Sequence, residues 1–151
     1  MSAFKLESPA FKDGTKIPRK YGYKEQNVSP PLNMGGAPPG TKSLALIMDD
    51  PDAMAPAGKV WDHWVIWNIA PDTEQIEEGT VPEGATEGKN DYGEIGYGGP
   101  APPDREHTYV FELYALDVVL DLEEGATKDR LKSTLKGHTL EKTVLRGTYA
   151  P

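Results

Sequence analysis

The chain has 151 residues, with 24 acidic and 16 basic side chains, a formal net charge of −8 and no cysteine. This length is typical of a single domain that buries its own hydrophobic core. Without cysteine the chain cannot form a disulfide, a thiolate metal site or a cysteine nucleophile. The acidic balance argues against binding to nucleic acid, which requires a basic surface, and against docking on anionic lipid.

The start of the chain has no recognisable targeting segment. Met1 to Lys5 is polar and lacks the apolar core of a signal peptide, and no apolar run reaches membrane-spanning length. The 16 glycines and 14 prolines are distributed along the chain rather than collected in a linker. We therefore expect one domain over residues 1–151, located in the cytoplasm and not integrated into a membrane.

Three segments predict β-strands, because each is a nearly continuous run of aliphatic, aromatic and β-branched residues. These predicted strands cover residues 43–49, 60–69 and 108–117. Such runs are typical of strands that are buried on both faces. Shorter edge strands are predicted at residues 81–82, 91–93 and 120–122.

Helices are predicted mainly late in the chain. The segment Thr127–Lys136 has a capping threonine, two leucines on one face and a glycine directly after it. A second helical turn is predicted where Leu140 and Val144 are four residues apart, and an acidic turn is predicted over 71–78. Strands followed by helices indicate a mainly-β domain with peripheral helices, and not an alternating α/β fold.

His63 lies inside the second predicted strand, which is otherwise apolar. The two-residue period of a strand predicts one face with Trp61, His63, Val65 and Trp67. The opposite face would carry Asp62, Trp64, Ile66 and Asn68. Two interpretations of His63 remain open: a core histidine that bonds to a loop carbonyl, or a ligand-binding residue.

His107 directly precedes the third predicted strand, and Tyr109 should project to the same side. The preceding loop, residues 98–103, is rich in glycine and proline. Its glycines permit close approach of the backbone to a ligand, and exposed N–H groups there could form an anion-binding nest. The alternative is an ordinary rigid surface loop.

Three carboxylates, those of Asp49, Asp50 and Asp52, follow the first predicted strand. Clustered carboxylates must be solvated, hydrogen-bonded or bound to a cation. They could form a metal site, orient a histidine or a hydroxylated ligand, or make a turn by bonding to nearby N–H groups. His138, the remaining histidine, is expected to cap or pack against the last helices. The sequence has no phosphate-binding Gly-Lys-Ser/Thr loop and no Gly-x-Ser-x-Gly elbow.

In combination, these motifs resemble those of the phosphatidylethanolamine-binding protein family, and in particular its short prokaryotic branch of Raf kinase inhibitor-like proteins. The resemblance extends from about Tyr23 to Tyr149 and rests on motifs that occur in the family's order. They are Asn27-Val28-Ser29-Pro30-Pro31-Leu32, Asp50-Pro51-Asp52-Ala53, Trp61-Asp62-His63-Trp64-Val65, Gly88-Lys89-Asn90-Asp91-Tyr92-Gly93, Gly99-Pro100-Ala101-Pro102-Pro103 and His107-x-Tyr109.

The resemblance implies a β-sandwich-like fold with a large and a small sheet, and a small pocket for phosphate, phosphorylated headgroups and similar anions. The family motifs assign this pocket to Asp50, His63, Gly99, Pro100, His107 and Tyr109. Asp52 and Trp61 would support it. The histidines and Tyr109 can donate hydrogen bonds. Asp50 would fix a histidine tautomer, raise that histidine's pKa, or accept from a ligand hydroxyl or amine.

The chain departs from the family pattern at several positions near this pocket. Thr108 stands where the family commonly has arginine, and Met34 stands where tryptophan is expected. Asp104, Arg105 and Glu106 occupy a loop in which glycine is more usual. The chain also ends without the C-terminal extension of the longer eukaryotic members.

These observations predict a non-enzymatic binding protein, without catalytic residues, cofactor or metal, for a small phosphorylated or anionic ligand. One alternative is an inhibitor of a protease or kinase that acts through a surface loop. A second alternative is a metal-assisted hydrolase that uses Asp50, Asp52, His63 and His107. Nucleic acid is not expected as a partner, and the chain is expected to be a monomer or a homodimer.

Overall fold

The computed structural model describes residues 3–151, so Met1 and Ser2 of the polar start lie outside the described residues. In chain order the elements are β1 (Lys5–Glu7), β2 (Thr15–Lys16), the 3₁₀-helix η1 (Arg19–Tyr21), β3 (Leu32–Gly35), β4 (Ser43–Asp50), the 3₁₀-helix η2 (Pro51–Ala53), α1 (Met54–Ala57), β5 (Trp61–Ile69), β6 (Gln75–Ile76), β7 (Thr86–Glu87), β8 (His107–Leu116), α2 (Lys128–Leu135) and β9 (Thr139–Tyr149). The chain is mainly β, as predicted. No helix in this described range is both long and apolar enough to span a membrane.

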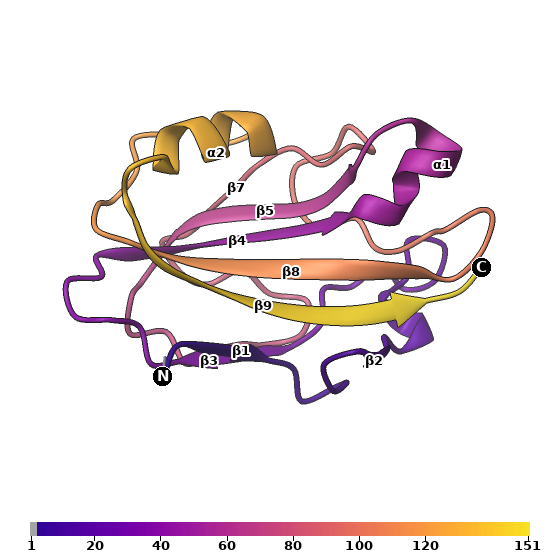
Figure 1. Ribbon diagram of the computed structural model, residues 1–151, viewed down its shortest axis with the longest axis horizontal. Helices are drawn as coiled ribbons and strands as arrows, with labels where there is room; N and C mark the ends of the chain where they lie inside the picture. The colour runs from indigo at the N-terminus through magenta and orange to yellow at the C-terminus, as the bar shows by residue number, and fades with distance from the viewer. Residues whose placement is uncertain (1–2) are drawn as a thin grey trace.

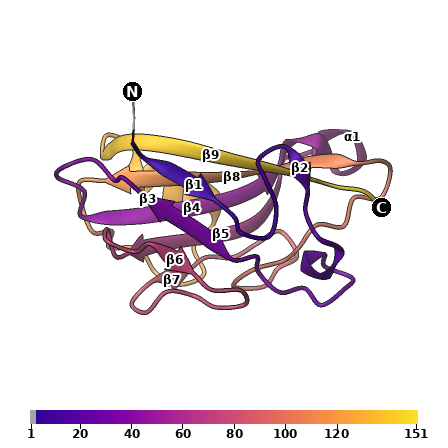
Figure 2. The ribbon, with the colours of Figure 1, turned by 90° about the horizontal axis from the view of Figure 1, so that it is seen from below.

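The strands form two sheets, which confirms the large and small sheets implied by the resemblance. The large sheet has the order β2-β9-β8-β4-β5-β7, and the small sheet has the order β1-β3-β6. Figure 1 shows the small sheet against one face of the large sheet, while α2 covers the other face. Seen from below, the strands of the small sheet lie across the large sheet (Figure 2).

Two hydrophobic cores join these layers. The core between the sheets includes Leu32, Met34, Met48, Trp64 and Phe111. The core beneath α2 includes Ile47, Val65, Trp67, Leu131 and Leu135. Because β4 contributes side chains to both cores, all of its residues are buried, and each large buried side chain stabilises the fold by about 1.5–3 kcal/mol.

The three predicted main strands and the helix predicted over residues 127–136 are confirmed. The predicted strands correspond to β4, β5 and β8, which are adjacent and antiparallel in the centre of the large sheet. In α2 the Thr127 hydroxyl accepts a hydrogen bond from the Arg130 N–H, and Leu131 and Leu135 are both buried. The helix therefore has the predicted cap and the predicted buried face.

The predicted helical turn around Leu140 and Val144 is wrong, because this segment forms β9. β9 pairs with β8 along most of the length of both strands. Toward its end the buried residues alternate, with Leu145, Gly147 and Tyr149 facing inward and exposed or half-buried residues between them. The strand follows α2 in the chain, so the predicted order of strands first and helices last is also wrong.

The smaller elements were predicted less accurately. Residues 71–78 do not form a helical turn; they contain β6, which pairs with β3 and buries Ile76 in the core between the sheets. None of the three predicted edge strands is formed. Around Tyr92 the chain turns instead, because the Asn90 carboxamide oxygen accepts from the N–H groups of Tyr92 and Glu94. Leu120 bonds to the Asn68 side chain through both its N–H and its carbonyl, so a side chain replaces a neighbouring strand.

The predicted division of β5 into two faces is wrong because the strand contains a β-bulge at His63. Met48 pairs with Trp64, whereas the next residue, Asp49, pairs with Asp62, so that His63 is an extra residue in the ladder. The bulge puts His63 on the face of Trp64, toward the small sheet, and Asp62 on the face covered by α2.

Candidate functional site

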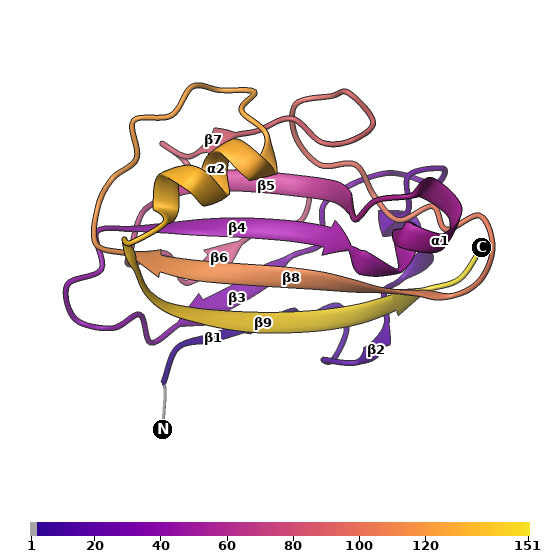
Figure 3. The same ribbon diagram turned by 45° about the horizontal axis from the view of Figure 1, so that its top comes forward.

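A cavity of about 180 Å³ lies at one end of the large sheet, where β4 ends and where β5 and β8 begin. It is lined by Asp50, Ala53, Pro56, Ala57, Trp61, His63, Tyr92, Ala101, Pro102, Pro103, His107 and Tyr109. Figure 3 shows α1 and the loop that precedes β8 at this end of the sheet. Five of the eight predicted site residues line the cavity: Asp50, Trp61, His63, His107 and Tyr109.

The three clustered aspartates have three different sets of partners. Asp50 ends β4 with one carboxylate oxygen accepting from the Asp52 N–H at 3.0 Å, which caps η2. Asp52 accepts from the Thr108 N–H at 2.9 Å and so ties this turn to β8. Asp49 points to the opposite face of the sheet, toward Lys128. The turn interpretation is therefore correct for Asp50, and the same carboxylate also reaches the cavity.

Lys128, the first residue of α2, is buried between two carboxylates. Its Nζ lies 3.1 Å from Asp49 and 2.6 Å from Asp62. Burial opposes the charged form of this lysine, but the two carboxylates outweigh it and raise the pKa of Lys128. Asp49 and Asp50 are adjacent in the chain but lie on opposite faces of the sheet, where Asp49 pairs with Lys128 and Asp50 contacts His107.

His63 is a neutral side chain in the wall of the cavity. Its Nδ1 lies 2.6 Å from the Gly98 carbonyl oxygen and donates to it, which leaves Nε2 as an acceptor. The ring packs edge-on against Tyr109, with centroids 5.2 Å apart. Burial lowers the pKa of His63 to about 4. The interpretation of His63 as a core histidine that bonds to a loop carbonyl is confirmed; His63 also lines the cavity, and its role as a ligand-binding residue stays a prediction.

His107 is held between two carboxylates. Its Nδ1 lies 2.6 Å from Asp50 Oδ2, and its Nε2 lies 2.7 Å from Asp104 Oδ1. Burial alone would lower the pKa of His107, but the two carboxylates outweigh it and raise the pKa. Since a carboxylate only accepts, both ring nitrogens donate and the ring is an imidazolium. Asp50 thus bonds to His107 and raises the pKa of this histidine, which is one of the roles expected for Asp50.

Two hydrogen-bond donors of the cavity wall have no partner among the described residues. They are the buried Nε1 of Trp61 and the buried Oη of Tyr109. Burial and the nearby Asp50 carboxylate raise the pKa of Tyr109, so its hydroxyl stays protonated and can donate. An unsatisfied buried donor costs about 1–3 kcal/mol, which a bound acceptor would recover.

The glycine-proline loop contributes apolar wall rather than N–H donors. The Gly98 N–H donates to the His63 carbonyl, and the Gly99 N–H donates to Asn27. Gly99 and Pro100 are not among the residues that line the cavity. A Cβ on Gly99 would lie 2.0 Å from the Tyr21 carbonyl oxygen, so the glycine is required for packing. The nest hypothesis is therefore not favoured, because these donors are already engaged.

Tyr92 and α1 line the cavity but were not predicted to do so. Tyr92 stacks on Tyr23 with ring centroids 3.7 Å apart, and its hydroxyl donates to the Gly99 carbonyl. The family motif that contains Tyr92 was recognised in the sequence, but Tyr92 was not assigned to the pocket. Residues 54–57 gave no helical signal, because α1 is a single turn that contains proline.

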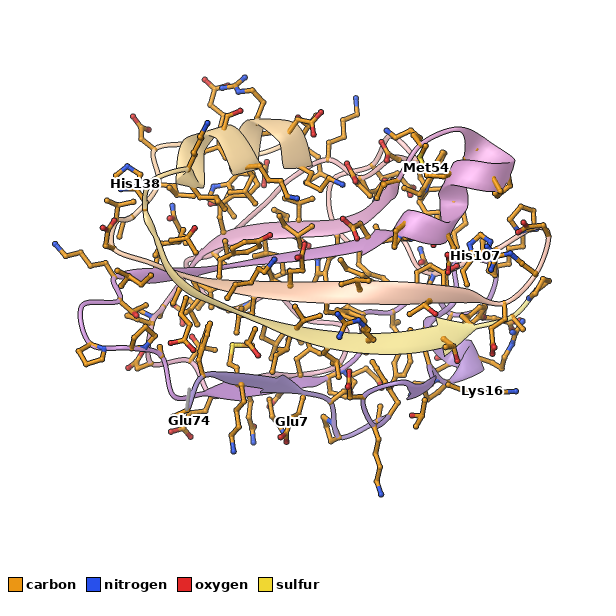
Figure 4. The ribbon with its side chains drawn as sticks, viewed as in Figure 1. Glu7, Lys16, Met54, Glu74, His107 and His138 are labelled. Atoms are coloured by element: carbon orange, nitrogen blue, oxygen red, sulfur yellow. The ribbon has the colours of Figure 1, made fainter. Side chains whose placement is uncertain are left out.

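His138 is remote from the cavity. Figure 4 shows His138 and His107 at opposite ends of the sheet. His138 Nδ1 lies 2.9 Å from Asp117 Oδ1, in the connection between α2 and β9. The expectation that His138 caps the last helices is confirmed for α2, because its N–H donates to the Leu135 carbonyl at 2.9 Å, but it is wrong for the second predicted helix, since the segment after His138 is a strand.

Comparisons with known proteins agree with this architecture. The sequence model of the family described as phosphatidylethanolamine-binding protein matches residues 7–150. A UPF0098 protein of Methanothermobacter thermautotrophicus is 49% identical over 149 residues, which cover 95% of this chain and 97% of the relative. A phosphatidylethanolamine-binding protein homologue of Chlamydia trachomatis superposes with a TM-score of 0.93 at 42% identity, over 99% of this chain and 98% of the other. Escherichia coli YbcL superposes with a TM-score of 0.90 at 28% identity, over 98% of each chain.

Fold and cavity thus define a member of a family of binding proteins. The chain belongs to the phosphatidylethanolamine-binding protein family. The resemblance inferred from the spaced sequence motifs is confirmed.

Proposed function

We propose that the chain is a non-enzymatic binding protein that takes the phosphate, or a comparable anionic group, of a small ligand into the cavity. The observation that carries the proposal is the pair of unpartnered donors, Trp61 Nε1 and Tyr109 Oη, in the cavity wall. Oxygen atoms of an anionic group would satisfy both donors. Membership in a family named for binding a phospholipid supports this class of ligand.

The size and charge of the cavity narrow the ligand further. A volume of about 180 Å³ is below the range of about 300–1,000 Å³ that is usual for drug-sized ligands, which favours a headgroup or a small phosphate ester. The net charge of −8 and the buried Asp50 oppose a highly charged anion. Asp50 and the rings of Trp61 and Tyr92 favour a ligand that also carries an amine or ammonium group.

Calorimetry with inorganic phosphate and phosphoethanolamine tests this function. Tyr109→Phe removes this donor and keeps the ring, so each affinity should fall about fivefold to thirtyfold, the equivalent of about 1–2 kcal/mol. Tyr114→Phe is the matched control, because Tyr114 belongs to the core beneath α2 and its hydroxyl bonds to Glu112. Absence of saturable binding by the unaltered protein, or equal affinity in the Tyr109 variant, would contradict the proposal.

The metal-assisted hydrolase is not favoured. Within residues 3–151 no group of three or more histidine, aspartate and glutamate side chains is arranged to hold a metal ion. Both nitrogens of His107 face carboxylates, and Asp52 already accepts from the Thr108 N–H. Inhibition of a protease or kinase stays a prediction, to be tested by assaying a panel of both enzyme classes with excess protein. Cytoplasmic location and a monomeric or homodimeric state also stay predictions.

A further inference from the structure

The Asp104 carboxylate occupies the nitrogen of His107 that an anionic ligand would need. Its Oδ1 lies 2.7 Å from Nε2, while Nδ1 is bonded to Asp50. An imidazolium has two N–H groups, and both are used here. A ligand anion can therefore receive a hydrogen bond from His107 only after one of the two carboxylates has moved away.

Of the two carboxylates, Asp104 is the one that can leave. The Asp50 side chain is 4% exposed, and it is also held by the Asp52 N–H. The Asp104 side chain is 37% exposed and lies on the loop before β8, three residues from His107. The next residue, Arg105, adds one exposed contact, 3.6 Å from Asp52, and exposed pairs of this kind contribute little.

Among the described residues no cation other than His107 bonds to Asp104, whose remaining hydrogen bonds come from the backbone N–H groups of Asp104 and Arg105. The groups that influence His107 are Asp50 and Asp104, with His63 and Tyr109 beside it in the cavity wall. Thr108 stands where a basic residue was expected, and its N–H faces Asp52. The imidazolium is thus the main attraction for Asp104 and, equally, for a bound anion.

We propose that Asp104 is an internal competitor, which covers the donor face of His107 in the unliganded protein and is displaced when an anionic ligand enters. The proposal rests on the proposed function. The loop that would move includes Ala101, Pro102 and Pro103, which form a wall of the cavity and also of a neighbouring cavity lined by Arg19 and Lys24. Displacement of Asp104 would therefore change the shape of both cavities.

The chain offers a matched pair of variants to test the competition. Asp104→Asn and Glu106→Gln each remove one negative charge from the same loop, but of these two residues only Asp104 contacts His107, and the Glu106 side chain is exposed. Calorimetry with inorganic phosphate is done at one ionic strength and at about pH 6, where His107 is protonated. We expect Asp104→Asn to bind phosphate about fivefold to tenfold more tightly than the unaltered protein. Glu106→Gln should change the affinity less than about twofold.

Each other outcome decides against the competition. If the unaltered protein binds phosphate and Asp104→Asn binds it equally or more weakly, Asp104 shapes the loop and does not compete, and the proposed function survives. If Glu106→Gln gains as much affinity for phosphate as Asp104→Asn, the gain comes from the lower negative charge of the loop and not from the release of His107. If neither the unaltered protein nor Asp104→Asn binds phosphate, the proposed function fails and the competition fails with it.

A second measurement uses the unaltered protein and does not depend on the folding of any variant. In a crystal soaked with phosphate, Asp104 should lie beyond hydrogen-bonding distance of His107 Nε2, while the contact between Asp50 and Nδ1 persists. Phosphate bound in the cavity with the Asp104 contact intact would overturn the proposal.

Discussion

Asp50 Oδ2 lies 2.6 Å from His107 Nδ1, and this buried contact joins the end of β4 to the start of β8. His63, in the same cavity wall, bonds instead to a neutral carbonyl. The two histidines consequently differ in charge: the carboxylates raise the pKa of His107, whereas burial lowers the pKa of His63 to about 4. The wall of one cavity thus holds a cationic histidine and a neutral histidine side by side.

This difference predicts how anion binding depends on pH. The two carboxylates favour the charged form of His107, whereas burial favours the neutral form of His63. Since the pKa of His107 is raised above 6.5, affinity for sulfate, an anion that does not itself titrate in this range, should fall as the pH rises through that higher value. Calorimetry at about pH 6 and about pH 9, with NMR titration of the three histidines, checks this. Loss of the His107 proton below pH 6.5 would contradict it.

Stability should fall in mild acid because of His63. The unfolded chain binds a proton at this histidine near pH 6.5, whereas the folded chain does so only near pH 4. The contribution of His63 to the free energy of unfolding is therefore fully present above pH 6.5, and up to about 3 kcal/mol of it is lost as the pH falls toward 4. Urea unfolding across this range should show the loss in the unaltered protein and a smaller loss in His63→Gln. Equal pH dependence of the two proteins would show that His63 is not responsible.

Removal of Lys128 should be strongly destabilising. Lys128→Met leaves Asp49 and Asp62 buried beneath α2 without their cation, which costs about 3–5 kcal/mol. The triple variant that also carries Asp49→Asn and Asp62→Asn should recover much of this loss, because no uncompensated charge remains. Urea unfolding measures both. If Lys128→Met were as stable as the unaltered protein, the ion pairs of Lys128 with Asp49 and Asp62 would not hold α2 to the sheet.

Gly99 should tolerate no side chain, although it does not line the cavity. Gly99→Ala would bring a Cβ to 2.0 Å from the Tyr21 carbonyl oxygen, so the loop must shift at a cost of about 1–3 kcal/mol. Gly35→Ala is the control, since nothing lies within 4 Å of its added Cβ, and its stability should change by about 0.5 kcal/mol or less. Thermal unfolding of the two variants tests the contrast. Equal transitions would refute this packing role.

The centre of the fold could be predicted from the sequence, because β4 and β5 are buried on both faces and β8 is buried or half-buried throughout, so that all three form nearly continuous apolar runs. β9 could not, since β9 lies toward the edge of its sheet and its outward residues are polar or half-buried. Leu140 and Val144 matched a helical spacing by coincidence. The small sheet was implied only by the resemblance, because strands of two to four residues are too short to show a period.

The candidate site was predictable in its residue types but not in its contacts. The motifs identified Asp50, His63, His107 and Tyr109, all of which line the cavity. The opposite charge states of the two histidines could not be read from the motifs, because they depend on which side chains meet across strands. Asp104 was noted only as a departure from the family pattern, and its contact with His107 depends on the path of an irregular loop.

The extra residue in β5 makes the cavity depend on a count of residues as well as on their identities. Trp61 and Trp64 are three positions apart, yet both face the small sheet, because His63 interrupts the alternation between them. Deleting His63 would restore a regular strand in which Trp61 and Trp64 are two positions apart and still share a face, so the cavity wall would lose its histidine while Trp61 keeps its side of the sheet. Changes of length in the exposed turn at residues 83–84 should be tolerated in this family, whereas one residue inserted between His63 and Trp64 should carry Trp61 to the side of α2 and abolish the site.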